Sequence, residues 1–348
     1  MFADRIEGKW IDAFGEVFER CRVQRGDTAA ILSETQSRRL NVQLAELALL
    51  RLGARPFHVV VPSPRNTHPV PVRSTGASEA LGKLAPVVTA LGQAGFVVDC
   101  TIEGLMHAAE TPAILKAGAR ILVISNEHPE ALERMAPDSE LEARVRAAAK
   151  MLRGAKQMSV ISAAGTNLQI EMTGAATVGV WGWTDRPGTL AHWPGGIVVS
   201  FCRSGSVNGT LVLDRGDINL TFKRYLETPL RLTLQADYVS QIEGAGTDAE
   251  LMRSYLAAWG DREAYAVSHV GFGLNRKARY EALSMYDRQH LNVTELRAVA
   301  GNFLFSTGAN EFAGRFTAGH FDIPVMRTSI AVDGTEVISA VVLQDVFG

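Results

Sequence analysis

Cysteine is scarce in this chain of 348 residues, and its three copies, Cys21, Cys100 and Cys202, stand far apart. No C-x-x-C pair occurs, so neither a disulfide framework nor a cysteine-held zinc site is indicated. Uninterrupted apolar runs are short, and none reaches the roughly 18 residues of a transmembrane helix. Charge of one sign is not in excess either. The 35 Lys and Arg face 37 Asp and Glu, which argues against a nucleic-acid binder that relies on a basic field.

The N-terminal sequence also lacks the features of a secretory signal. Charges of both signs interrupt the apolar residues of MFADRIEGKW, so no basic start is followed by an apolar centre. Scattered, unpaired cysteines are typical of proteins that stay in a reducing compartment. We therefore expect a cytoplasmic protein.

Several nucleotide and hydrolase motifs are missing. There is no G-x-x-x-x-G-K-[ST] phosphate loop, no G-x-S-x-G nucleophile elbow and no H-E-x-x-H zinc motif. Gly271-Phe272-Gly273 supplies only the first two glycines of a dinucleotide fingerprint, and Leu274-Asn275-Arg276 follows. We therefore expect no dinucleotide cofactor, even where the fold is Rossmann-like.

The first half of the chain alternates helical and strand patterns. Apolar runs such as 120–125 are continuous, which is typical of strands buried on both faces of a parallel sheet. The alternation predicts βαβ units and a Rossmann-like α/β domain over residues 1–155. Strands are expected at 29–33, 57–61, 96–100 and 120–125, and helices at 5–22, 40–52, 77–94, 111–119 and 141–152.

The pattern changes after residue 155. Short strands separated by Gly, Asn and Asp turn residues replace the alternation, with one helix expected at 248–259. One long strand is expected at 231–242, and Asp333-Gly334 is expected to form a hairpin turn. Residues 156–348 are therefore predicted to form a second, α+β, strand-rich domain.

Gly319-His320-Phe321-Asp322 is the segment with the clearest chemical potential. Side chains alternate along a strand, so His320 and Asp322 point to one face and can meet one cation. A third ligand must come from elsewhere, and His269 offers it from a strand-like segment with nearby glycines. The alternative is a buried histidine bonded to the backbone, with Asp322 in a turn or a salt bridge.

Two histidines and one carboxylate form a facial set that leaves coordination positions open and suits non-haem Fe(II). Fe(II) can bind O₂ and an electron-rich substrate side by side, whereas zinc on the same ligands would activate a water for hydrolysis. The spacing of the three residues alone is a weak signal for either metal.

Further segments occur in one order along the chain and cover most of residues 180–325. They are Asp185-Arg186-Pro187-Gly188, His192-Trp193-Pro194, Gly209-Thr210-Leu211-Val212-Leu213-Asp214, Gly216-Asp217-Ile218, Ser268-His269-Val270-Gly271-Phe272-Gly273-Leu274, Gly301-Asn302-Phe303-Leu304-Phe305-Ser306-Thr307-Gly308 and His320-Phe321-Asp322-Ile323-Pro324. In this order they resemble the 2,5-dihydroxypyridine 5,6-dioxygenase family, whose members open the ring of N-heterocycles. The first domain is similar in pattern, with a local match around Leu105-Met106-His107.

The resemblance implies a role for each candidate residue. It implies that Fe(2+) is held by His269, His320 and Asp322, and that the substrate lies near His107, His192 and Ser306. Ring cleavage needs a base to take a hydroxyl proton and an acid to return one, and histidine does both near neutral pH. Ser306 is expected to hydrogen-bond substrate or oxygen. The alternatives are a helix-entry residue for His107, a loop residue packed on Trp193 for His192, and a core-strand end for Ser306.

The implied activity is an extradiol-type, non-haem Fe(II) dioxygenase of pyridine catabolism. Its reaction is aromatic ring cleavage, in which 2,5-dihydroxypyridine and O₂ give N-formylmaleamate. The implied partners are a small N-heterocyclic substrate and O₂, in a homo-oligomer without nucleic acid or membrane. Two alternatives stay open. One is a hydrolase like the distantly related leucyl-aminopeptidase-like metalloenzymes, which hold two metal ions, and the other is a small-molecule binder without catalysis.

One departure from the family concerns position 180. Family members place a glutamate near the substrate just before the segment Trp181-Gly182-Trp183, and here that position is Val180. The substituents of the substrate ring are therefore left open. Trp181, Trp183 and Trp193 are expected either to form an aromatic wall against a flat ring or to serve ordinary packing.

Overall fold

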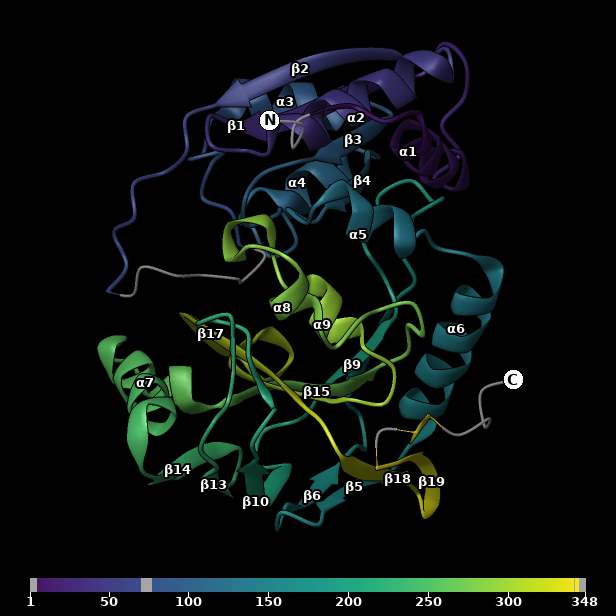
Figure 1. Ribbon diagram of the computed structural model, residues 1–348. Coiled ribbons are helices and arrows are strands. Elements are labelled where there is room, and N and C mark those ends of the chain that lie inside the picture. Colours follow the sequence, from purple (N-terminus) through teal and green to yellow (C-terminus); the bar gives the residue numbers. More distant parts are fainter. Residues whose placement is uncertain (1–4, 70–76, 341, 344–348) are drawn as a thin grey trace.

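The computed structural model describes residues 5–69, 77–340 and 342–343. Figure 1 shows two lobes, with the N-terminal helices and strands at the top and the C-terminal strands below. The short helices α8 (Ala282–Met285) and α9 (Thr294–Ala298) lie between the lobes. Among the described residues, no helix combines the length and the apolar character needed to cross a membrane.

The N-terminal lobe is built on a parallel sheet. Within the described residues it has five strands in the order β2-β1-β3-β4-β8, and every neighbouring pair is parallel. Apolar residues are buried on both of its faces, which is why the strand sequences are continuous apolar runs. The predicted Rossmann-like α/β arrangement is therefore confirmed. The strands are β1 (Thr28–Glu34), β2 (Arg55–Val61), β3 (Phe96–Asp99), β4 (Arg120–Ile124) and β8 (Leu190–Trp193).

Helices cover both faces of this sheet. Ala29 and Ile31 of β1 pack with α1 and α2 on one face, and Ala30 and Leu32 pack with α3 and α4 on the other. Because side chains alternate along β1, successive residues of this one strand enter the cores on opposite faces of the sheet. The helices are α1 (Gly8–Arg20), α2 (Arg39–Arg51), α3 (Ala85–Gln93), α4 (Thr111–Lys116), α5 (Pro129–Arg134) and α6 (Ser139–Gly154).

The chain crosses between the lobes more than once. α6 packs its buried face into the C-terminal core, together with residues of β5 and β6. β8 then returns to the N-terminal sheet, where Leu190 pairs with Ile121 and Trp193 with Ile124 of β4. The division of the chain at residue 155 stays a prediction.

The C-terminal lobe consists of two antiparallel sheets that share one core with α6. Within the described residues, the larger sheet has the order β14-β13-β10-β6-β5-β18-β19-β20 and the smaller one β17-β16-β15-β9-β7. The prediction of a strand-rich α+β fold for this part of the chain is confirmed.

The larger sheet contains β5 (Gln157–Ser162), β6 (Asn167–Glu171), β10 (Val207–Leu213), β13 (Leu230–Gln235), β14 (Tyr238–Gly244), β18 (Thr328–Val332), β19 (Thr335–Ser339) and β20 (Val342–Leu343). The smaller contains β7 (Ala176–Val180), β9 (Ile197–Phe201), β15 (Val267–Gly273), β16 (Phe303–Asn310) and β17 (Arg315–Val325). Beside them lie the two-stranded sheet of β11 (Ile218–Asn219) and β12 (Arg224–Tyr225), and the helix α7 (Gly246–Ala258).

The smaller sheet has two different faces. One face packs into the C-terminal core through Val198, Val270, Phe272, Phe303, Phe305, Phe321 and Ile323. The alternating residues point the other way, toward the N-terminal lobe, and we call this the site face. It carries Val178, Val180, Ile197, Val199, Phe201, His269, Leu304, Ser306, His320 and Asp322. One face buried and one face open is the usual arrangement of an antiparallel sheet.

Some local predictions need correction. The helix expected at 77–94 begins only at Ala85, because Gly82 and Lys83 adopt positive φ of 50° and 61° and break the helical path. The strand expected at 231–242 is a hairpin of β13 and β14, which turns at Ala236 and Asp237 with φ of 46° and 76°. Ala-Asp is not a usual pair for such a turn, so the sequence did not indicate it.

The hairpin turn predicted at Asp333-Gly334 is confirmed. Asp333 and Gly334, with φ of 47° and 83°, connect β18 and β19. Asn-Gly and Asp-Gly suit this turn because both positions require φ above zero.

Gly179 sets how closely β7 can approach α6. A Cβ atom at Gly179 would lie 2.8 Å from Val145 Cγ1 and 3.2 Å from Ala149 Cβ. We expect G179A to lower the free energy of unfolding in urea by about 1–3 kcal/mol, because overpacking shifts the helix from the sheet. G154A is the matched control, since nothing lies within 4 Å of a Cβ atom there and alanine favours a helix. Equal stability of the two variants would contradict the prediction.

Candidate metal centre

Three predicted ligands meet on the site face of the smaller sheet. His269 comes from β15, and His320 and Asp322 come from alternate positions of β17. Ligand atoms of the three residues all lie within 4.8 Å of one another. His269 Nε2 is 3.7 Å from Asp322 Oδ1, and His320 Nε2 is 3.2 Å from Asp322 Oδ2. The predicted convergence of these residues is therefore present in the structure.

Small residues on the intervening strand allow the ligands to approach. β16 lies between β15 and β17, and it places Ser306 opposite Asp322 and Gly308 opposite His320. No large side chain therefore separates the two imidazoles, whose ring centroids are 5.8 Å apart.

Arg297 on α9 fixes the Asp322 carboxylate. Its Nε donates a hydrogen bond of 2.6 Å to Asp322 Oδ2. Burial opposes ionisation of Asp322, but His320 and Arg297 outweigh it and hold the pKa of the carboxyl well below its usual range. Asp322 Oδ1 is buried and has no hydrogen-bond partner among the described residues, which suits an oxygen that binds a cation.

His269 is a neutral imidazole. Burial lowers its pKa to about 3, so the ring keeps a nitrogen lone pair for a metal at neutral pH. The Phe201 ring packs edge-on against it, with centroids 5.4 Å apart. Two imidazoles and one carboxylate with an unpartnered oxygen are a donor set that fits a divalent transition metal.

A cavity of about 370 Å³ opens in front of the three ligands. Loops after β3 and β4 form its N-terminal wall, where Thr101–Gly104, Met106–His107 and Ser125–Asn126 line the space. Carboxyl ends of parallel strands are the usual place for a ligand in an α/β sheet. The lining of the C-terminal wall comes from the site face of the smaller sheet and from Asn292, Thr294 and Arg297.

His107 lines this cavity beside His320. Its ring is exposed to the open space, yet protein surrounds it closely enough that burial lowers its pKa to about 4. The Asp99 carboxylate holds the preceding loop, because it accepts hydrogen bonds from the backbone N–H groups of Thr101, at 2.9 Å, and Leu105, at 2.6 Å. These hydrogen bonds fix the loop, so the neutral His107 is held close to the proposed metal ligands.

His192 reaches the same cavity from β8. Its Nδ1 lies 2.7 Å from the carbonyl oxygen of Pro194, so Nδ1 carries the proton and donates it. Burial lowers the pKa of His192 to about 4, which leaves Nε2 as a neutral acceptor. The structure therefore brings His107 and His192 together at one site, as expected from the sequence.

Ser306 lies beside the ligands but does not line the cavity. It is completely buried opposite Asp322, and its Oγ has no hydrogen-bond partner among the described residues. The proposed contact between Ser306 and substrate or oxygen stays a prediction.

The tryptophans do not form a wall of the cavity. Trp193 is buried in the N-terminal core, where its Nε1 donates to the carbonyl oxygen of Met135 at 3.1 Å. Trp181 and Trp183 each pack against an arginine, with the guanidinium carbon of Arg146 4.1 Å from the Trp181 ring. Packing, the second alternative for these residues, is therefore correct. The aromatic lining comes instead from Phe201 and Phe312.

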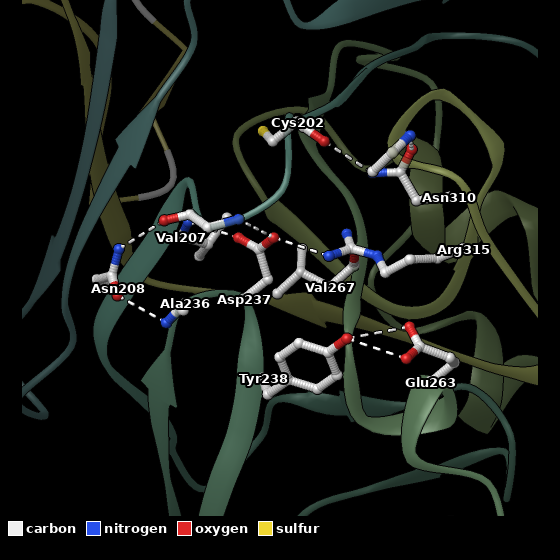
Figure 2. Close-up of polar contacts among 12 residues, drawn as sticks. Cys202, Val207, Asn208, Ala236, Asp237, Tyr238, Glu263, Val267, Asn310 and Arg315 are labelled. Carbon is white, nitrogen blue, oxygen red and sulfur yellow. Dashed lines mark hydrogen bonds and ion pairs between the residues drawn. The ribbon is translucent and has the colours of Figure 1, made fainter.

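A buried ion pair between Asp237 and Arg315 holds together β15 and β17, the two strands that carry the metal ligands. Figure 2 shows Asp237, in the turn between β13 and β14, facing Arg315 at the start of β17. Arg315 Nη1 is 2.8 Å from Asp237 Oδ2, and Nη2 donates to the carbonyl oxygen of Val267 at 2.7 Å. Val267 begins β15, so Arg315 ties the strand of His269 to the strand of His320 and Asp322.

The comparisons with known proteins identify the family of this chain. A model of the NicX family, described as 2,5-dihydroxypyridine 5,6-dioxygenase, matches residues 9–345. The chain belongs to this family. The 2,5-dihydroxypyridine 5,6-dioxygenase of Pseudomonas putida KT2440 is 36% identical over 334 residues, which are 94% of this chain and 93% of the relative. The family expected from the ordered segments, and with it a ring-cleaving dioxygenase, is confirmed.

Solved structures show the same relationship. The structure of 2,5-dihydroxypyridine dioxygenase from P. putida KT2440 superposes on this NicX-family chain with a TM-score of 0.89 and 34% identity, and covers 97% of each chain. Wild-type AmpT from Thermus thermophilus has a TM-score of 0.66 at 14% identity, and covers 96% of this chain and 98% of AmpT. The similarity to AmpT shows a shared fold alone.

Sequence reasoning missed two residues that shape this site. Arg297 lies outside every motif, and only the packing of α9 against β17 reveals its contact with Asp322. Asp237 was assigned to the middle of a strand, although it forms a buried turn. The sequence gives no signal of either contact, because the partners are far apart in the chain: Arg297 binds Asp322, and Asp237 binds Arg315.

We expect wild-type protein to bind one divalent transition metal and D322A to lose more than about 100-fold in affinity. R297M should lose less, about 10–100-fold, because Arg297 only supports a ligand. Titration calorimetry with anaerobic Fe(II), or with Co(II), measures both changes. D12A, at an exposed aspartate, is the control and should bind as wild type does. Unchanged affinity of D322A would rule out this metal centre.

Proposed function

We propose that this protein is an Fe(II)-dependent dioxygenase that opens the ring of 2,5-dihydroxypyridine between carbons 5 and 6. The product is N-formylmaleamate, which retains both atoms of O₂. The observation that carries this proposal is the arrangement of His269, His320 and Asp322 at the bottom of a cavity that two neutral histidines also line. Membership of the NicX family supplies the reaction that this arrangement fits.

His269, His320 and Asp322 would hold the ferrous ion. O₂ reacts slowly with closed-shell organic molecules, and Fe(II) with open coordination positions supplies the electronic route that lets it react with a bound ring. Arg297 keeps Asp322 ionised and oriented, through the 2.6 Å hydrogen bond to Oδ2. The carboxylate therefore stays available to the cation over the physiological pH range.

His107 acts as the general base in this proposal. Its lowered pKa leaves the imidazole neutral, so that Nδ1 or Nε2 can take a proton from a ring hydroxyl. Loss of that proton makes the ring more electron-rich, which favours attack by oxygen. The imidazolium then sits beside the reacting atoms and returns the proton after the ring has opened.

His192 positions the ring rather than moving a proton. Its Nδ1–H is engaged with the Pro194 carbonyl, so Nε2 can only accept a hydrogen bond, from a hydroxyl or a ring N–H. We propose that Ser306 contacts O₂ rather than the substrate ring, because its unpartnered hydroxyl lies opposite Asp322. The Oγ–H group of Ser306 can donate a hydrogen bond to O₂.

A two-metal hydrolase is the weaker alternative. Among residues 5–69, 77–340 and 342–343, the one group of three or more His, Cys, Asp or Glu side chains close enough to share a cation is His269, His320 and Asp322. A second ion would need further carboxylates beside these three, and the site face offers valines and a leucine there.

We also propose that the protein is cytoplasmic and a homo-oligomer. Cys21, Cys100 and Cys202 are free, buried thiols, which suits a reducing compartment. Phe312, in the turn after β16, and Phe316, at the start of β17, are 67% and 70% exposed and supply apolar surface for an association between copies.

Oxygen consumption tests the proposed reaction directly. Protein loaded anaerobically with Fe(II) should consume one O₂ per 2,5-dihydroxypyridine, with N-formylmaleamate as the product by mass spectrometry. Metal-free protein should consume none until Fe(II) is restored. If neither this compound nor other hydroxypyridines and dihydroxybenzenes cause uptake, while leucine is released from a peptide, the hydrolase alternative is correct.

H107Q should keep its iron and lose about 10²–10⁴-fold in kcat, because the amide cannot accept and return a proton. A colorimetric iron assay checks that H107Q keeps its iron, and an oxygen electrode measures its loss of kcat. H58Q changes a half-exposed histidine of β2 in the N-terminal lobe, and it should behave as wild type. A loss of only twofold in H107Q would remove His107 from the chemistry.

A further inference from the structure

Four branched aliphatic side chains form a patch at the edge of the site face farthest from β17. β7 pairs with β9 so that Val178 lies opposite Val199 and Val180 lies opposite Ile197. All four line the cavity in front of the metal centre, and we call them the aliphatic patch. Gly179, between the two valines of β7, faces α6 instead, which confirms that the valines point into the cavity.

The patch lies beyond the reach of an unsubstituted ring that binds beside the ligands. In the strand order β17-β16-β15-β9-β7, His269 is on β15 and the two valines of β7 are two strands away. Strands are about 4.8 Å apart, so roughly 10 Å of sheet separates them. A single ring next to His269 covers β9 and leaves Val178 and Val180 uncovered. Val178 is 42% exposed, so its side chain is accessible to a ligand.

Glycines of β15 let the neighbouring backbone pack closely beside the aliphatic patch. Gly271 and Gly273 follow His269 on the same face, and Gly271 pairs with Val199 and Gly273 with Ile197. A Cβ atom at Gly271 would collide with the backbone of Val198, so glycine is required there. Between His269 and the valines of β7 lies β9, whose Phe201, Val199 and Ile197 side chains line the cavity. The cavity of about 370 Å³ has room for more than one ring.

The aliphatic patch offers a substrate no side-chain hydrogen bond and no charge. A carboxylate placed there would lose its water without gaining a partner, which is costly. An alkyl group would bury apolar surface on both sides, which is favourable by about fourfold in binding for each added carbon. The chemistry of the patch thus separates apolar from charged substituents.

We propose that the substrate class of this protein is the alkyl-substituted 2,5-dihydroxypyridines, with the alkyl group bound over Val178 and Val180. The inference rests on the proposed function and adds the part of the substrate that the ring-cleaving residues do not contact. The reaction itself is unchanged: one O₂ is consumed per ring, and the alkyl group stays on the ring-opened product.

The test is a comparison of kcat/KM across a panel. The panel contains 2,5-dihydroxypyridine, its 3- and 4-methyl and 3- and 4-ethyl derivatives, and its 3- and 4-carboxy derivatives. We expect the better methyl isomer to exceed the parent by about fourfold, the matching ethyl compound to exceed it further, and both carboxylates to fall below it. A parent compound that exceeds all four alkyl derivatives, or a carboxylate that equals them, overturns the inference.

The outcomes also separate this inference from the proposed function. If the parent is opened and the alkyl derivatives gain nothing, only the substrate class is wrong. If no compound of the panel is opened by the iron-loaded protein, the proposed function fails and the substrate class fails with it.

Substitutions in the aliphatic patch test whether the preference for alkyl-substituted substrates depends on Val178 and Val180. V178T and V180T keep the shape of the side chain and replace one methyl group by a hydroxyl, so each should lower the ratio of alkyl to parent kcat/KM toward one. V60T makes the same change at a valine of β2 that is 61% exposed and lies outside the cavity, and it should leave the ratio as in wild type. A wild-type ratio in both V178T and V180T contradicts the assignment of the alkyl group to β7.

Discussion

The alternation of side chains along β17 is the constraint on which the site depends. Phe321 and Ile323 are buried in the C-terminal core, and this fixes the register of the strand against β16. With that register fixed, His320 and Asp322 must emerge together on the opposite face. A slip of one residue would exchange the two sets and bury both ligands in the core. The apolar residues therefore determine where the metal ligands lie, although they never contact the metal.

Electrostatics then gives different charge states to four ionisable side chains that line one cavity, His107, His192, His269 and Asp322. Burial keeps His107, His192 and His269 neutral, whereas Arg297 and His320 keep Asp322 charged. Neutral imidazoles and an ionised carboxylate are the states in which these groups bind a cation or accept a proton. The same burial that lowers the histidine pKa values would raise that of Asp322, and His320 and Arg297 together reverse the effect for this residue.

The sequence predicted the parts of this site that local rules determine. The period of two along a strand is enough to place His320 beside Asp322, and continuous apolar runs are enough to indicate the parallel sheet. His269 was a candidate third ligand from its strand-like segment, and the ordered resemblance to a family supported it. The choice of His107 and His192 depended on that resemblance, because no local rule connects residues so far apart in the chain. Arg297 and Asp237 could not be predicted, since each acts through a partner distant in sequence that only the tertiary packing brings close. The turn at Ala236 and Asp237 was missed for a related reason. The carboxylate of Asp237 is held by Arg315 and by the N–H groups of Gly205 and Val207, a long-range stabilisation that turn propensity does not contain (Figure 2).

The position of β8 has a consequence for the growing polypeptide. This strand completes the N-terminal sheet next to β4, yet more than sixty residues separate the two strands in the chain, including α5, α6 and β5–β7. During translation the first four strands leave the ribosome well before the fifth, so β4 remains an unpaired edge for that interval. The nascent N-terminal lobe cannot close its sheet, or place His192 at the cavity, until part of the C-terminal lobe has already been made.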